Sequence, residues 1–264
     1  VNADNSGQTV TQGSGSAVPD EAPVITQRNS SAETSNTITI NASENATANV
    51  TISNVNIDTS GAAVSTGGKG NVNIELDGTN TLKSGRYHAG LEKSQDGKLT
   101  ITDENANGKL IATGGDYGAG IGGDDQGNGK NITITGGEVT AAGGTNGAGI
   151  GGGGGISGKG EKISISGDAA LKVQGGPTDG WDGAGAGIGN GGGHNGDFLS
   201  GTIPVNGAET EPDTSNLTTG KIEYYAPGAD MTKDEPTSTI LGSGQPTSPG
   251  ETAAPVEYRM QTSA

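Results

Sequence analysis

The chain has 264 residues, of which 52 are glycine and none is cysteine, and its formal net charge at pH 7 is −16. The missing cysteines exclude a disulfide scaffold and a cysteine-ligated zinc or iron–sulfur site, and a pI near 4.3 disfavours binding to nucleic acid or to an anionic membrane surface. Hydrophobic residues make up only 28% of the chain and no apolar run is long enough for membrane insertion, so we expect order to come from repetition rather than from a large core.

Residues 1–34 are polar and rich in glycine, serine and threonine. This composition predicts a linker or a loosely ordered lead-in. The chain begins at Val1 and continues with polar residues, as a mature secreted protein or a cut fragment would.

A sequence unit recurs between residues 35 and 200, where we place the main domain. The run Gly-Ala-Gly-Ile-Gly-Gly at Gly118–Gly123 recurs at Gly147–Gly152 and, one residue shorter, at Gly185–Gly189. Weaker copies precede it at Ala62–Val64 and Ala89–Leu91. The aliphatic anchors of the five copies are 27, 30, 29 and 38 residues apart, which indicates one structural unit repeated about five times.

Each unit also contains short segments in which apolar and polar residues alternate, the pattern of a strand with one buried face. Three such strands per unit predict an all-β protein, a single-stranded right-handed parallel β-helix of about five coils. Stacked aliphatic residues would form its thin core, and glycine would allow its sharp corners. We expect Leu99, Ile101, Ile132, Ile134, Ile163 and Ile165 to point inward and Thr100, Thr133 and Ser164 to point outward.

The repeat stops near residue 200. We expect residues 201–264 to form a C-terminal extension of strands and loops that caps the last coil or tethers the chain. The segments Ile222–Tyr225 and Val256–Tyr258 have strand-like sequences. The residues from Pro236 to Pro255 are rich in proline, serine, threonine and glycine, which predicts a loop or a surface tether.

The Gly-Ala-Gly-Ile-Gly-Gly repeats, with Ile132–Ala141 between two of them, resemble the β-helical carbohydrate-binding domain proteins of cellulolytic and gut Firmicutes. The fold of that group is similar to the fold of pectate lyases. The resemblance covers residues 35–196 and implies binding of a polysaccharide or host glycan, sometimes with calcium, outside the bacterial cell. The shared motif consists of scaffold glycines and core aliphatic residues, so it assigns no ligand-binding residue.

Two cofactor sites need to be considered. Gly118–Gly123 and Gly147–Gly152 match the Gly-x-Gly-x-x-Gly dinucleotide fingerprint, but each run continues into turn sequence and not into the helix that would face the pyrophosphate. We therefore expect no dinucleotide. Carboxylates in glycine-rich turns could instead hold calcium, and the densest group, Asp116, Asp124 and Asp125, is the candidate metal site, although solvated turn acids are the more common meaning of such a group.

The sequence offers little support for catalysis. A lyase acting on an acidic polymer needs a cation or an arginine or lysine base, and Arg86 is the one arginine of the repeat region. His88 and His194 are isolated in the sequence, and no serine or acid lies in a recognisable nucleophile motif. We therefore expect the protein not to be an enzyme.

Two tyrosines hold equivalent positions in consecutive repeats. Tyr87 and Tyr117 each lie two residues before the alanine of the Ala-Gly-Leu or Ala-Gly-Ile anchor. Equivalent positions of neighbouring coils stack at a spacing of about 4.8 Å, so we predict that the two rings are neighbours on one corner. Arg86 and Asp116, one residue earlier, should stack as an exposed ion pair of little energetic value.

An insertion falls in the matching turn of a later repeat. The interval between anchors is 17 residues at Leu171–Ile188 but 11 residues at Val139–Ile150, and the extra residues lie around 177–182. Insertions in repeats often build a binding face. Alternatively, Trp181 covers the core as a lid and the tyrosines form a structural ladder. The predicted ligand-binding residues are Tyr87, Tyr117, Asp179, Trp181 and Asp182.

The leading hypothesis for function is a secreted or cell-surface, non-catalytic module that binds glycans or mediates adhesion. A passive structural stalk or scaffold is the alternative, and a polysaccharide lyase is the third. Threonine pairs such as Thr133 and Thr135 also suggest an ice-binding face, but the charged Glu75 interrupts the array.

Overall fold

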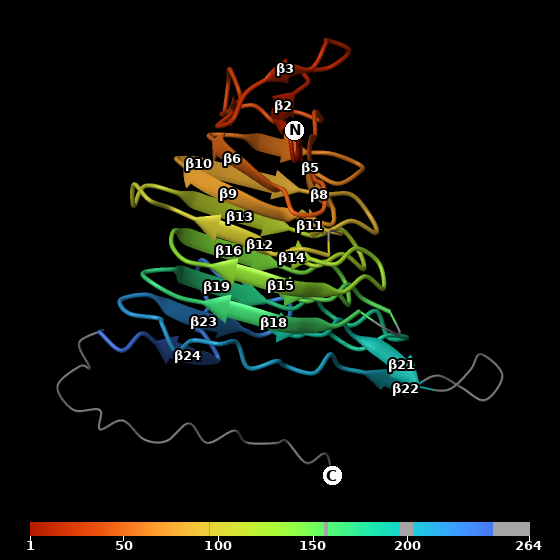
Figure 1. The fold of residues 1–264 in the computed structure, drawn as a ribbon. Coiled ribbons are helices and arrows are strands. Elements are labelled where there is room, and N and C mark those ends of the chain that lie inside the picture. Colours follow the sequence, from red (N-terminus) through yellow and green to blue (C-terminus); the bar gives the residue numbers. More distant parts are fainter. Residues whose placement is uncertain (95, 156–157, 196–202, 245–264) are drawn as a thin grey trace.

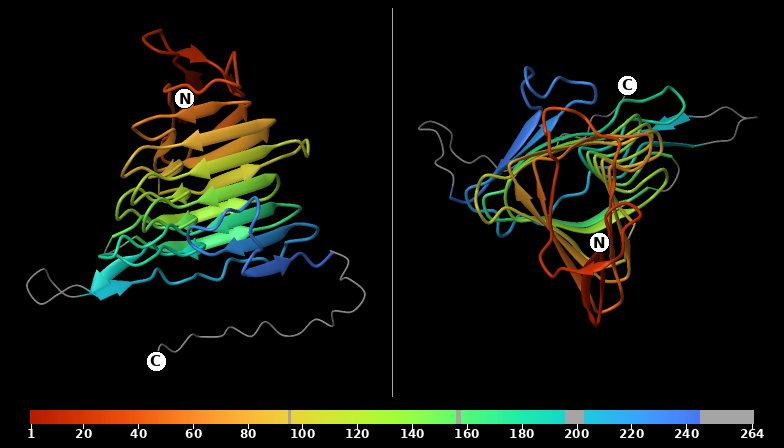
Figure 2. Two further views of the ribbon diagram at one scale, coloured as in Figure 1. Left: turned by 180° about the vertical axis from the view of Figure 1, so that it is seen from behind. Right: turned by 90° about the horizontal axis from the view of Figure 1, so that it is seen from above.

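The computed structural model describes residues 1–94, 96–155, 158–195 and 203–244. These residues contain no helix, and their strands stack into a parallel β-helix of about five turns, which confirms the predicted fold class (Figure 1). Three sheets, here called A, B and C, form the sides of the β-helix. The view along the axis in Figure 2 shows the chain passing from one side to the next around the centre.

Sheet A contains nine strands and extends past the N-terminal end of the repeat. In spatial order from the C-terminal end, they are β20 (Ile188–Gly189), β17 (Ile150–Gly151), β14 (Ile121–Gly122), β11 (Leu91–Lys93), β8 (Val64–Gly68), β5 (Ile38–Ala42), β1 (Asn2–Asp4), β2 (Gly7–Val10) and β3 (Val18–Pro19).

Sheets B and C contribute the other two strands of each turn. Sheet B contains β18 (Gly160–Ile165), β15 (Gly129–Ile134), β12 (Leu99–Thr102), β9 (Asn71–Asp77), β6 (Thr47–Ser53) and β4 (Val24–Thr26). Sheet C contains β24 (Ser238–Leu241), β23 (Lys221–Tyr225), β19 (Ala170–Gln174), β16 (Glu138–Ala142), β13 (Lys109–Thr113), β10 (Thr79–Lys83) and β7 (Asn56–Asp58). A separate hairpin pairs β21 (Gly193–Asn195) with β22 (Ile203–Val205).

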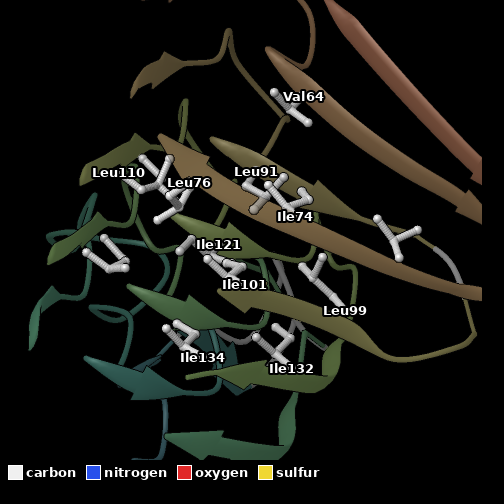
Figure 3. Close-up of a cluster of buried hydrophobic side chains, with 14 of the residues drawn as sticks. Val64, Ile74, Leu76, Leu91, Leu99, Ile101, Leu110, Ile121, Ile132 and Ile134 are labelled. Carbon is white, nitrogen blue, oxygen red and sulfur yellow. The ribbon is translucent and has the colours of Figure 1, made fainter. Parts of the chain in front are cut away.

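The core is a set of aliphatic columns that run along the axis, as the alternating sequence predicts (Figure 3). In sheet B, Ile101 pairs with Ile134, and Ile134 pairs with Ile165. All three side chains are fully buried, whereas Thr100, Thr133 and Ser164 between the core positions are only partly buried. Each turn therefore buries its few aliphatic side chains against those of the turns before and after it.

Glycine is required where neighbouring turns approach closely at the end of the sheet A strands. Gly122 and Gly151 occupy equivalent positions in paired strands and both have φ near 138°. A Cβ atom on Gly122 would lie 2.1 Å from the carbonyl oxygen of Gly151, so no other residue fits without moving the backbone. Here the glycine content has a direct steric cause.

Residues 1–34 do not form the linker that their composition predicts. β1 pairs in parallel with β5, β4 pairs in parallel with β6, and Thr34 bridges to Ile57 of β7. The segment therefore places a strand or a bridge on each of the three sheets and forms an incomplete turn. Without it, the first complete turn would expose unpaired backbone groups along its strand edges.

The C-terminal extension lies against the last turn. β23 pairs in parallel with β19, as the sequence of Ile222–Tyr225 predicts, and β24 covers β23 in antiparallel orientation. β24 falls inside the stretch from Pro236 to Pro255, so the prediction of a continuous loop there is wrong, because this segment completes the edge of sheet C. The predicted strand at Val256–Tyr258 lies outside the described residues.

One lysine lies on the inward face of sheet A. Lys93 is 4% exposed and pairs in the ladder with Thr66, which is also buried. Burial lowers the pKa of Lys93 to about 8, against the opposing effect of Asp96. The core thus contains an ionisable group that the hydrophobic pattern did not indicate.

Candidate ligand-binding corner

Tyr87 and Tyr117 stack at the corner between sheets C and A, as their equivalent spacing predicts. Their ring centroids are 5.8 Å apart and the ring planes differ by 21°. The backbone ladder continues through this corner, where the amide of Tyr87 donates to the carbonyl of Asp116 at 2.8 Å. Both tyrosines have positive φ, 74° and 68°, a conformation that costs a residue with a side chain about 1 kcal/mol or more. The corner therefore fixes the backbone from which both rings project.

Asn146 is the third member of the same column. It lies two residues before the next anchor alanine and also has positive φ, 66°. Its side chain is fully buried, and Nδ2 donates to the carbonyl oxygens of Asp182 at 3.0 Å and Gly183 at 2.9 Å. Among the described residues, Oδ1 of Asn146 has no hydrogen-bond partner. Asn146 thus replaces the tyrosine of earlier turns and holds the inserted segment in place.

Arg86 stacks with the tyrosines and does not form the predicted ion pair. The guanidinium carbon of Arg86 lies 4.5 Å from the ring centroid of Tyr87 and 5.7 Å from that of Tyr117. Asp116 instead accepts a hydrogen bond from the hydroxyl of Thr145 at 2.8 Å. The aromatic rings attract the guanidinium through a cation–π interaction, which an exposed carboxylate does not outweigh.

The inserted loop, residues 177–182, is organised by Asp179. Its Oδ1 accepts hydrogen bonds from the backbone amides of Trp181 at 2.9 Å and Asp182 at 2.8 Å, and its Oδ2 accepts one from the hydroxyl of Tyr117 at 2.9 Å. Burial by itself would raise the pKa of Asp179, but these hydrogen bonds together lower it. The same contact raises the pKa of Tyr117, so its hydroxyl stays protonated and acts as a donor.

Trp181 lies in the loop that Asp179 connects to the tyrosine stack. Its residue surface is 55% exposed, and that of Tyr87 is 43% exposed. The prediction that the loop reaches the tyrosine corner is therefore confirmed through Asp179, whereas Trp181 itself presents its surface to solvent. This exposure contradicts the alternative in which Trp181 is a lid buried over the core.

Asp182 ends the inserted loop and pairs with a histidine from the hairpin β21–β22. Oδ1 of Asp182 lies 2.5 Å from Nδ1 of His194, and both side chains are largely buried. The backbone adds a second link, because the amide of Gly183 donates to the carbonyl of Gly193 at 2.9 Å. His194, which looks isolated in the sequence, therefore joins the loop to the hairpin.

A hollow of about 220 Å³ lies between the tyrosine corner and the loops that lead from sheet A to sheet B. The described residues that line it do not include Trp181 or Asp179. They are Arg86, Tyr87, Tyr117, Asp125, Gln126, Gly155, Asp182 and His194.

Asp125 is a partly buried carboxylate in the lining of the hollow. Burial raises the pKa of Asp125, and the negative charges of Asp124 and Asp182 raise it further, while a hydrogen bond with Gln126 and the charge of Arg86 oppose the change. Asp124 and Asp182 thus lie close enough to Asp125 to act on its charge.

A larger hollow, of about 290 Å³, lies at the N-terminal end and is lined by residues of β1, β2 and their neighbours. It contains no aromatic or basic side chain among its lining residues. Its polar groups serve the fold, since Oε1 of Glu21 accepts from the amide of Gln8 at 3.0 Å. We therefore place the candidate site at the tyrosine corner.

The structure does not join the three residues of the predicted metal site. Asp124 and Asp125 share one loop, but Asp116 lies on the corner and is hydrogen-bonded to Thr145. Within the described part of the chain, no three histidine, aspartate or glutamate side chains gather closely enough to hold a metal ion. Calcium binding stays an untested prediction.

Comparisons of the chain with protein families, curated proteins and solved structures find no match. In the described residues, no helix of the length and hydrophobicity needed to cross a bilayer is found. The case for function therefore depends on the geometry of the corner.

Sequence reasoning missed several parts of this corner. Asn146 could have been found, because it has the same offset from the anchor alanine as the two tyrosines. Gln126 and His194 gave no such signal, since Gln126 lies in a loop between repeat strands and His194 lies on β21 of the separate hairpin.

Proposed function

We propose that this chain is a non-catalytic module of the bacterial cell surface that binds glycans or mediates adhesion, and that the tyrosine corner is where a sugar docks. The observation that carries the proposal is the stacked pair Tyr87 and Tyr117, which borders a hollow next to a loop with an exposed tryptophan. Aromatic rings of this kind offer a flat apolar face to the C–H groups of a sugar, and polar neighbours can hydrogen-bond its hydroxyls.

The corner is prepared for binding without rearrangement. The inserted loop is held by Asp179, Asn146 and Asp182 through at least one hydrogen bond each. Groups that are already ordered lose little conformational freedom when a ligand binds. Large exposed aromatic residues on a rigid frame are typical of binding surfaces.

A passive stalk is the second candidate, and one observation favours it. Both carboxylate oxygens of Asp179, a predicted ligand-binding residue, are engaged by Tyr117 and by the loop backbone. This residue therefore shapes the loop and does not face a ligand. A corner in which all such contacts were internal would serve stability alone.

Calorimetric titration with a panel of oligosaccharides tests the proposal. We expect at least one sugar to bind the wild-type chain, and we expect Tyr87→Ala and Trp181→Ala each to weaken that binding about tenfold, the effect of losing one stacking face. Leu241→Ala is the matched control, because Leu241 is an equally exposed hydrophobic residue on β24.

Three outcomes separate the candidates. Weaker binding in both aromatic variants, with unchanged binding in Leu241→Ala, supports the glycan-binding corner. Absence of binding across the panel would favour the stalk, whereas equal binding by all variants would refute the tyrosine corner as the binding site. Release of an unsaturated, ultraviolet-absorbing product from an acidic polysaccharide would show a lyase and refute a non-catalytic module.

A further inference from the structure

The charged groups in and around the hollow are mostly acidic. Asp125 and Asp182 face it with two carboxylates, against the guanidinium of Arg86 and the imidazole of His194, which is already paired with Asp182 at 2.5 Å. Two more carboxylates, those of Asp124 and Asp179, lie close enough to raise the pKa of Asp125 and of Tyr117, respectively. A ligand that brings positive charge into the hollow therefore meets a favourable field.

The tyrosine pair already holds a cation. Arg86 lies over the Tyr87 ring and within 5.7 Å of the Tyr117 ring centroid. The faces of aromatic rings carry partial negative charge, which the guanidinium of Arg86 already satisfies here. An incoming ammonium group is therefore directed away from the rings and toward the carboxylates that line the hollow.

We infer that the hollow selects sugars that carry a free amino group, such as oligomers of glucosamine, over neutral and acidic sugars. This inference rests on the proposed glycan-binding function. The sugar ring lies against the tyrosine corner, and its ammonium group pairs with Asp125 next to Asp182. The geometry supplies an acceptor for the charge and an apolar face for the ring within one hollow.

Acidic sugars fit this site poorly. A uronate would bring its carboxylate close to Asp125 and Asp182, and the two basic side chains of the lining are both engaged, Arg86 with the tyrosine rings and His194 with Asp182. The net charge of −16 for the chain also opposes the approach of a polyanion. Neutral sugars would keep the stacking contact but would leave the carboxylates without a new partner.

Asp125 is the residue on which the preference depends. Burial and two neighbouring carboxylates disfavour its ionised form, and an incoming ammonium group would relieve this cost. Asp182 is less available, because His194 occupies its Oδ1 at 2.5 Å.

Calorimetric titration of the full chain with four tetrasaccharides of matched length tests the inference. The glucosamine tetramer is cationic, the N-acetylglucosamine and glucose tetramers are neutral, the galacturonate tetramer is acidic, and all four consist of pyranose rings. We expect the glucosamine tetramer to bind roughly threefold to tenfold more tightly than its acetylated form, as one partly exposed ion pair allows. Added salt should reduce this difference.

The variants locate the effect. Asp125→Asn should remove the preference for the amino sugar and keep the binding of the acetylated form, whereas Asp116→Asn, an exposed acid on the same corner outside the lining of the hollow, should keep both. Equal binding of all four sugars, tightest binding of the acidic sugar, or a preference unchanged in Asp125→Asn would overturn the inference but leave glycan binding intact. Binding of none of them would overturn the proposed function together with it.

Discussion

The two ends of the β-helix close open strand ladders with different side chains. At the N-terminal end, Gln8 accepts a hydrogen bond from the amide of Asn49 at 2.8 Å and donates one to the carbonyl of Asn49 at 2.9 Å. At the C-terminal end, the carboxylate of Glu209 accepts hydrogen bonds from the amides of Gly187 at 2.7 Å and Ile188 at 3.0 Å. An amide side chain matches one donor and one acceptor, and a carboxylate matches two donors.

The interior turns show what each cap replaces. The amides of Gly149 and Ile150 donate to the carbonyls of Ala186 and Gly187 in the next turn, each at 2.9 Å. In the last turn, the equivalent amides of Gly187 and Ile188 donate to the two oxygens of Glu209 instead. The comparison teaches that the end of a parallel β-helix is closed by whichever side chain fits the backbone groups that its last rung leaves unpaired.

The largest expected effect comes from breaking the column that connects both ends. Ile134→Asp places a carboxylate in the fully buried sheet B column between Ile101 and Ile165, and we expect it to cost about 3–5 kcal/mol or more in the free energy of unfolding. Thermal unfolding followed by circular dichroism measures this loss, with Thr133→Asp on the outer face as the control. A variant as stable as the wild type would contradict the assigned core.

Removing the N-terminal cap should have the next largest effect. Gln8→Leu keeps most of the volume of this buried side chain but leaves the amide and the carbonyl of Asn49 without their partner. We expect the free energy of unfolding to fall by about 1–3 kcal/mol. Hydrogen exchange at Asn49 should become faster, whereas the exposed Gln12→Leu should change neither quantity.

The sequence predicted the repeated turns well but did not predict the caps at the two ends. The alternation that buries Ile101 and Ile134 is repeated in every turn, so the sequence contains several copies of the same evidence. Gln8 and Glu209 each occur once, and each recognises backbone groups that exist only after the repeat has folded. No periodic pattern could have indicated them, and the first 34 residues were predicted to be a linker for this reason.

The same distinction applies to the candidate site. The stacking of Tyr87 on Tyr117 was predictable, because both residues have the same offset in their repeats. The contact between Tyr117 and Asp179 depends on the path of an insertion, and the pair of Asp182 with His194 depends on a hairpin outside the repeat. Spacing placed the insertion at the tyrosine corner, but it did not indicate which side chains of the loop and of the hairpin would form these contacts.

Lys93 lies in an interior turn, and its effect on stability should change with pH in a way that can be compared with the end caps. Burial lowers the pKa of Lys93 to about 8. As the pH rises, the folded chain therefore loses this proton at a lower pH than the unfolded chain does. The stability of the wild type should therefore rise as the pH increases from about 8 toward the ordinary lysine pKa of about 10.4. Lys93→Met should lack this rise and should be more stable by about 1–3 kcal/mol near neutral pH, whereas Lys98→Met at an exposed position should behave like the wild type.

The smallest expected effect is at Glu209, and its sign is opposite. Burial of the carboxylate raises the pKa of Glu209 above its ordinary value, although the amides of Gly187 and Ile188 oppose the shift. The folded chain takes up this proton at a higher pH than the unfolded chain does. Protonation of Glu209 should therefore increase the stability of the fold as the pH falls through the raised pKa toward the ordinary glutamate pKa of about 4.3. Below that pH the gain in stability should level off. Glu209→Gln has no charge to titrate. Its side-chain NH2 group would face one of the two backbone amides that also donate, so the variant should be less stable than the wild type. This difference in stability should grow as the pH falls.

Melting temperatures at about pH 7 and about pH 5 test this expectation against Glu211→Gln, an exposed control. A constant difference between wild type and Glu209→Gln across this range would show that the carboxylate keeps its charge, and that the C-terminal cap is as insensitive to pH as the uncharged Gln8 cap.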